Sequence, residues 1–213
     1  MAKGSISLRL VESDNTIKKH ILASIVDDIN KRIKKNKKKV ITLLGNSVKS
    51  WVYEQPEIES LLKSGAPESL NAQFGIPTGR AAGVVHAIVD SIVKSGVFKI
   101  GKISDKLRGE VSFNFQSKDL MNVLSLPGGH VTTSKGTDLH WLDWLLTKGD
   151  TTIILGYSYV AGPLGRSGGG EMNIGGMWRV PPEFSGTQSD NFISRAFLGR
   201  EKETNEILKR LLQ

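Results

Sequence analysis

The stretch 97–103 reads Val97-Phe98-Lys99-Ile100-Gly101-Lys102-Ile103, and the hydrophobic period of the chain changes there. Apolar and polar residues alternate along it, as they do again in 109–115. This period is typical of β-strands with one buried face. Between residues 14 and 95 the apolar residues recur at helical steps instead. Helices followed by strands predict an α+β fold. A parallel βαβ sheet would need helices and strands to alternate regularly, and this chain shows no such alternation.

The N-terminal half, about 14–95, is predicted to be helical. The first helix follows Asp14 or Thr16, either of which can act as its N-cap, and it ends in a basic run. Its apolar residues define one face and are Ile17, Ile21, Leu22, Ile25, Val26, Ile29 and Ile33. Further helical segments are predicted over 40–52, after Pro56, and over 81–93, the last closed by Ser95-Gly96.

The second half, about 97–188, is predicted to be rich in strands. A short helix is expected over 138–146, and strands over 151–159 and 172–180 are joined by a glycine-rich loop. A terminal helix, about 190–212, follows a cap at Ser189 or Asp190 and is interrupted at Gly199. We therefore expect one α+β domain over 1–213, with the N-terminal helices and the C-terminal helix packed on an antiparallel β-sheet.

Composition narrows the function classes. The 213 residues include no cysteine, which excludes disulfides and thiolate metal sites and fits a cytosolic compartment. No apolar run approaches the roughly 18 residues of a membrane span, and the N-terminus lacks the apolar core of a signal peptide. We expect no membrane partner. The formal charge of +8 favours association with a polyanion.

The positive charge is concentrated in one basic run, which consists of Lys31, Arg32, Lys34, Lys35, Lys37, Lys38 and Lys39. Such a run can contact phosphates and give salt-dependent binding to nucleic acid, or it can face an acidic protein surface. A solvated helix end is the favoured interpretation, because basic runs are common on exposed helix faces. Because no aromatic residues are interleaved with the lysines, a base-stacking platform is not expected.

No set of residues predicts catalysis or a cofactor. The loop Gly162–Gly170 contains many small residues, but it leads into a strand and lacks the Gly-Lys-Ser or Gly-Lys-Thr of a phosphate-binding loop. We interpret it as a mobile hairpin loop. Ser158 has valine at 160, where a nucleophile elbow needs glycine.

The histidines are also interpreted as structural or incidental. His20, His86, His130 and His140 show no compact metal-ligand spacing, so no metal site is expected. A hydrolase that uses His140 with Asp138 or Asp143 is the least favoured of the functional alternatives.

Aromatic side chains and prolines gather in the last third of the chain. Trp141 and Trp144 are expected in the core, whereas Trp178 and Phe184 flank two prolines that direct the chain away from the sheet. The residues expected at a subunit interface are Trp178, Arg179, Pro181, Pro182, Phe184, Phe192 and Phe197.

This last third resembles neck and tail-completion proteins of tailed bacteriophages, which are also described as head-tail connector and tail terminator proteins. The similar segments are 140–146 with Gly149-Asp150, 165–168, 178–187 and 190–196, within roughly the C-terminal 75 residues. The resemblance implies a non-enzymatic structural protein of the virion, without cofactors, that assembles as a ring where the DNA-filled head joins the tail.

The same resemblance implies the partners and the place of assembly. These are further copies of the chain, portal or adaptor proteins, tail proteins, and non-specific contact with packaged DNA, with assembly in the host cytoplasm. A ring needs one patch to meet a different patch on the next subunit. The alternative function is a basic nucleic-acid-binding protein of phage replication or packaging.

Overall fold

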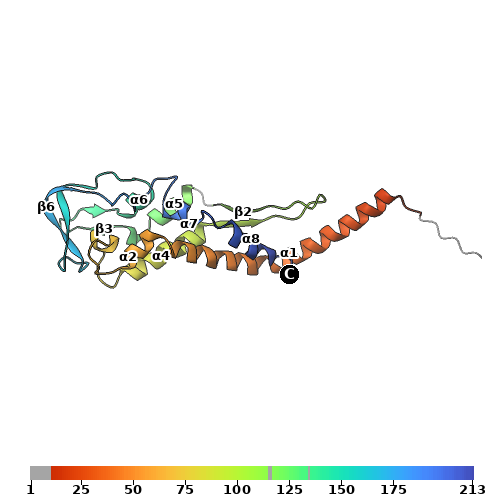
Figure 1. Cartoon of the computed structure of the whole chain (residues 1–213), viewed down its shortest axis with the longest axis horizontal. Coiled ribbons are helices and arrows are strands. Elements are labelled where there is room, and N and C mark those ends of the chain that lie inside the picture. Colours follow the sequence, from red (N-terminus) through yellow and green to blue (C-terminus); the bar gives the residue numbers. More distant parts are fainter. Residues whose placement is uncertain (1–10, 115–116, 134) are drawn as a thin grey trace, which may run out of the picture.

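The computed structural model describes residues 11–114, 117–133 and 135–213. Its longest element is α1 (Asp14–Tyr53), one helix of 40 residues. Figure 1 shows the N-terminal part of α1 extending beyond the body of the molecule. Ser13 is the N-cap, and its hydroxyl accepts a hydrogen bond from the Thr16 amide at 3.3 Å. The predicted caps Asp14 and Thr16 are therefore wrong by one and three positions.

The sequence predicted that the basic run ends the first helix. This is wrong, because the run lies within α1. Helical apolar spacing continues through it from Ile33 to Val40 and Leu44, all of which are buried, and lysine is a good helix former. Nothing in the run therefore interrupts the helix, and its charges do not complement a helix C-terminus.

Three further helices complete the N-terminal half. They are α2 (Pro56–Leu62), which begins with proline at its first position, α3 (Leu70–Gln73) and α4 (Ala81–Ser95). The helices after Pro56 and over 81–93 were predicted from the sequence and are confirmed. The four-residue α3 was not predicted, because it is too short to show a helical period.

The described strands form three separate two-stranded antiparallel sheets. The pairs are β1 (Val97–Ile100) with β2 (Val111–Asn114), β3 (Val131–Thr132) with β4 (Asp138–Leu139), and β5 (Ile154–Ala161) with β6 (Gly170–Trp178). The mixed α+β class is confirmed. The expectation of a single sheet beneath the helices is wrong for the described residues, because each strand pairs only with the other strand of its own hairpin.

The remaining helices are short. They are α5 (Ser117–Leu124), α6 (Leu142–Leu146), α7 (Phe192–Ala196) and α8 (Glu201–Lys209), with a 3₁₀ turn η1 over Pro127–Gly129. The predicted helix over 138–146 thus begins with the two-residue strand β4 and is helical only over Leu142–Leu146. The predicted break at Gly199 is confirmed, since this glycine has a φ of 72° between α7 and α8.

The main core joins both halves of the chain. Its buried residues come from the end of α1, from α2, α3 and α4, and from α5, α6, β6 and α7. Trp141 is fully buried and stacks on Phe74 with a centroid distance of 4.9 Å. A second cluster packs α1 against β1 and α8 through Ile33, Val40, Leu44, Ile100, Ile207 and Leu211. Along the described chain, no helix combines the length and apolar character that crossing a bilayer requires.

Candidate functional site

The predicted interface residues divide into buried and exposed groups. Trp178 is 5% exposed and Phe192 is fully buried, so neither offers surface to a partner in this conformation. The Trp178 indole donates a hydrogen bond to the Gln73 side chain at 3.3 Å and contacts Phe74 edge-on. Phe184 and Phe197 are partly buried against the main core. The interface prediction is wrong for Trp178 and Phe192, because they pack in the core of this chain, and it stays a prediction for Phe184 and Phe197.

Arg179 and Pro182 are exposed and Pro181 is partly exposed, so they remain interface candidates. Arg179 forms an ion pair with Asp150 at 3.5 Å in which both side chains are mostly in solvent. Such exposed pairs contribute little to stability and can be exchanged for contacts with another molecule.

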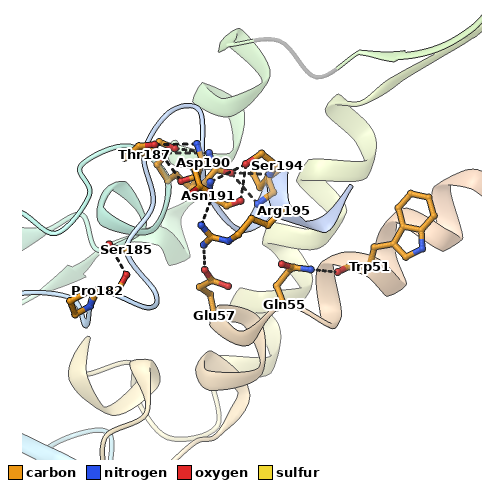
Figure 2. A network of polar contacts seen from close by, with 12 residues as sticks. Trp51, Gln55, Glu57, Pro182, Ser185, Thr187, Asp190, Asn191, Ser194 and Arg195 are labelled. Carbon is orange, nitrogen blue, oxygen red and sulfur yellow. Dashed lines mark hydrogen bonds and ion pairs between the residues drawn. The ribbon is translucent and has the colours of Figure 1, made fainter. Parts of the chain in front are cut away.

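A polar network holds the segment 182–195 against the helices (Figure 2). Its centre is Arg195, whose guanidinium bonds the buried carboxylate of Glu57 on α2 and also the Asp190 carboxylate at 2.8 Å. Glu57 is 1% exposed. Burial raises the pKa of this carboxyl above its ordinary value, and the facing guanidinium opposes the rise.

Asn191 is the second anchor of this network. Its side-chain oxygen accepts from the amides of Ile193 and Ser194, which caps α7, and Ser194 completes a capping box by accepting from the Asn191 amide. The side-chain nitrogen of Asn191, Nδ2, donates to the carbonyls of Leu146 and Thr187. The segment 182–195 therefore includes the cap and ion pairs that hold this part of the chain against the helices.

The glycine-rich loop is a packed hairpin loop. Ser167 is fully buried and donates to the Ala72 carbonyl at 3.3 Å, while Thr78 donates to the Ser167 carbonyl. The amides of Gly168, Gly169 and Gly170 are bonded to partners within the loop itself. These amides are not free to bind a phosphate, and the contacts with the helices argue against the predicted mobility of the loop.

The basic run of α1 presents most of its charge to solvent. Lys34, Lys35, Lys38 and Lys39 are exposed and, among the residues the structure describes, have no ion-pair partner. Lys31 and Arg32 form ion pairs with Asp27 and Asp28 one turn earlier. Lys37 turns inward and donates to the Ile100 carbonyl at 3.3 Å. We call the four unpaired residues the lysine face.

Apolar side chains are exposed at two places that the sequence did not indicate. On the projecting part of α1, Ile21, Leu22 and Ile25 are 54%, 39% and 43% exposed. We call these three residues the α1 stripe. On the β5–β6 hairpin, Leu155, Ile174 and Met177 are 77%, 89% and 62% exposed, and we call them the hairpin patch. Contiguous exposed apolar surface is typical of contacts with other molecules.

The hairpin β3–β4 brings His130 and His140 to Asp138. The predicted scatter of the histidines is wrong for this pair, because the chain reverses between them. Asp143, the other predicted partner of His140, lies in α6, where its carbonyl accepts from Thr147. No serine side chain bonds either histidine in the described structure, so no nucleophile–base pair is present there.

Two surface hollows of the described chain show no converging set of acid and base groups. The larger, of about 630 Å³, lies between α4 and α5, and its one carboxylate, Asp90, is bound to Lys49 at 2.6 Å. The second, of about 320 Å³, lies between α1, β1 and α8 and is lined largely by apolar side chains. Neither is lined by histidine.

Comparison with known proteins gave no match, whether to protein-family models, to curated proteins or to solved structures.

Proposed function

We propose that this chain is a structural subunit of an oligomeric ring in the neck of a tailed bacteriophage, where the head meets the tail. The observation that carries the proposal is the α1 stripe on a helix that projects beyond the body of its own subunit. A 40-residue amphipathic helix with part of its apolar face uncovered is suited to packing against a neighbouring subunit.

The positions of the two exposed apolar surfaces support a ring. The α1 stripe and the hairpin patch lie at opposite ends of the elongated molecule (Figure 1). Surfaces that differ from each other and face different directions favour heterologous contacts, which close into rings when the rotation between subunits permits. In this proposal the ring interface is built from these surfaces, with Arg179 and Pro182 at its rim.

Oligomeric state tests the role of the α1 stripe. The double variant Ile21→Asp with Ile25→Asp places two charges on the stripe without disturbing a buried residue. Ala23→Asp is the matched control, because Ala23 is exposed and the 3.6-residue period places it on the opposite side of the helix. We expect light scattering to show a discrete oligomer for the wild type and for the control, and smaller species for the double variant.

Some ring proteins assemble only on a partner surface, so the comparison is repeated by co-purification with portal and tail proteins. A wild-type chain that is monomeric under both conditions would contradict the proposal. Equal assembly of the wild type and the double variant would exclude the α1 stripe as the contact.

The second candidate function is non-specific binding to DNA, and the lysine face favours it. Four unpaired cations along two turns of an exposed helix can contact successive phosphates. Because these residues carry no base-reading pattern, binding is expected to be independent of sequence.

Salt dependence tests this second candidate. Replacing Lys34, Lys35, Lys38 and Lys39 by glutamine should lower the slope of log K against log salt by up to about 0.9 per lost phosphate contact. Lys37 is retained because it bonds the body. Lys202→Gln with Lys209→Gln, on α8, is the control of the same charge type. An unchanged slope in the quadruple variant would exclude the lysine face as the DNA contact.

A further inference from the structure

His130, Asp138 and His140 lie on one face of the β3–β4 hairpin. Val131 pairs with Leu139, so the residues just outside this pair, His130 and His140, are cross-strand neighbours. Their rings stack with a centroid distance of 5.0 Å and an interplanar angle of 15°. Asp138 precedes His140 by two residues, and the period of a strand places both side chains on the same face.

The three side chains converge on one point. The Asp138 carboxylate lies 2.7 Å from His130 Nδ1 through one oxygen and 3.2 Å from His140 Nε2 through the other. One ligand atom from each residue lies within 4.8 Å of the other two. Ligand atoms bound to zinc at about 2.1 Å in a tetrahedral site are about 3.4 Å apart. Small rotations of these partly exposed side chains therefore suffice to bring all three to a common ion.

We propose that His130, Asp138 and His140 form a binding site for a divalent transition-metal ion of the zinc type. Two imidazoles and one carboxylate suit zinc, cobalt or nickel, whereas magnesium and calcium prefer oxygen ligands alone. The three side chains are 35%, 44% and 53% exposed in chain order. The remaining coordination positions therefore face solvent and are filled by water.

The backbone on each side of the site is held by the core, which orients the two histidines. Trp141 follows His140 and is fully buried against Phe74. Gly129 precedes His130 and packs so closely on α6 that an added Cβ would lie 3.0 Å from the Leu142 side chain. Ligands fixed by packed neighbours lose less freedom on binding, and this favours metal affinity.

A bound ion would stabilise the β3–β4 hairpin. It has two paired residues on each strand, and hairpins this short are marginally stable in water. An ion bound by residues from both strands stabilises the pairing by linking the two strands. The site does not depend on the proposed assembly, since all three ligands come from one chain.

The third ligand is suited to binding a cation. The hydrogen bond from His130 holds the pKa of Asp138 below its ordinary value, so this carboxylate is ionised at neutral pH.

Zinc titration of the full-length chain, purified without a histidine tag, tests the site. Calorimetry should show one zinc ion per chain. His130→Asn and His140→Asn should each weaken the Kd by roughly 10-fold or more. His20→Asn is the matched control, because His20 is exposed on α1 and should not affect binding.

A second measurement does not depend on the variants folding. In NMR spectra of the wild-type chain, zinc should shift the imidazole signals of His130 and His140. The imidazole signals of His20 and His86 should stay in place. Absence of zinc binding by the wild type would overturn the proposal. So would equal affinity in the three histidine variants, or shifts confined to His20 and His86.

Discussion

At the scale of single residues, Glu57 shows how this protein tolerates a buried charge. Its carboxylate is 1% exposed, and one of its two oxygens has no hydrogen-bond partner in the described structure. Burial of an ionised group is costly unless a countercharge is close. Arg195 supplies that charge and links α2 to α7 and to the segment that precedes it.

Removing Arg195 should therefore be far more damaging than removing an exposed arginine. We expect Arg195→Met to lower the free energy of unfolding by about 3 kcal/mol, because it leaves Glu57 buried without a partner. Arg179→Met, which breaks an exposed pair with Asp150, should cost less than about 1 kcal/mol. Urea denaturation of both variants measures the difference, and equal losses would contradict the assigned role of Arg195.

The raised pKa of Glu57 makes a prediction about pH. A carboxyl whose pKa is higher in the folded than in the unfolded chain binds its proton more tightly when folded. Its stabilising contribution is present below the unfolded pKa and is lost as pH rises through the folded value. Relative to Glu57→Gln, the wild type should gain stability on acidification from about pH 8 to about pH 4. A difference between the two that does not change with pH would refute this.

Residue-scale predictions from the sequence succeeded where spacing alone decides burial. Trp141 was expected in the core and is fully buried, and Trp144 packs against the core. Trp178 was expected at an interface, and this failed because its partner Gln73 is distant in sequence. The convergence of His130 and His140 had one local sign, since Asp138 and His140 alternate as strand residues do.

At the scale of elements, the segment that crosses α6 depends on a close backbone contact. The Gly186 amide donates to the Trp144 carbonyl at 3.0 Å, and its carbonyl accepts from Gly149 at 2.8 Å. A Cβ at position 186 would lie 1.9 Å from the Leu145 carbonyl oxygen. No side chain can occupy that space without moving the backbone.

Gly186→Ala should consequently lower the free energy of unfolding by about 2–4 kcal/mol, as overpacking against a fixed backbone does. Gly162→Ala is the control, because a Cβ there meets nothing within 4 Å, and its effect should stay within about 0.5 kcal/mol. Thermal unfolding of both variants provides the comparison. A Gly186→Ala protein as stable as the control would show that α6 and this segment do not pack as described.

The sequence predicted well which elements are helices and which are strands. It did not predict which other elements pack against them. Helical spacing identified the apolar face of α1, including Ile21 and Ile25, and alternation identified β1 and β2. The spacing could not show whether the same chain covers that face, because a buried stripe and an exposed stripe have the same period. Alternation likewise predicts strands but not their partners, so the strands of the separate β1–β2 and β5–β6 hairpins were expected to form one sheet. The β3–β4 hairpin was not predicted.

At the scale of the whole molecule, the main core and the exposed surfaces have separate roles. The core joins both halves of the chain and takes in Trp178 and Phe192. The α1 stripe, the hairpin patch and the lysine face lie outside it. In the proposed ring, the stripe and the patch contact neighbouring subunits, and the lysine face meets DNA or an acidic partner.

Imaging of the intact virus particle at side-chain resolution tests the proposed ring most directly. We expect this chain to form a closed ring at the junction of head and tail, with Ile21 and Ile25 of each subunit buried against the next. Particles that lack the chain, or that contain it with both isoleucines exposed to solvent, would contradict it.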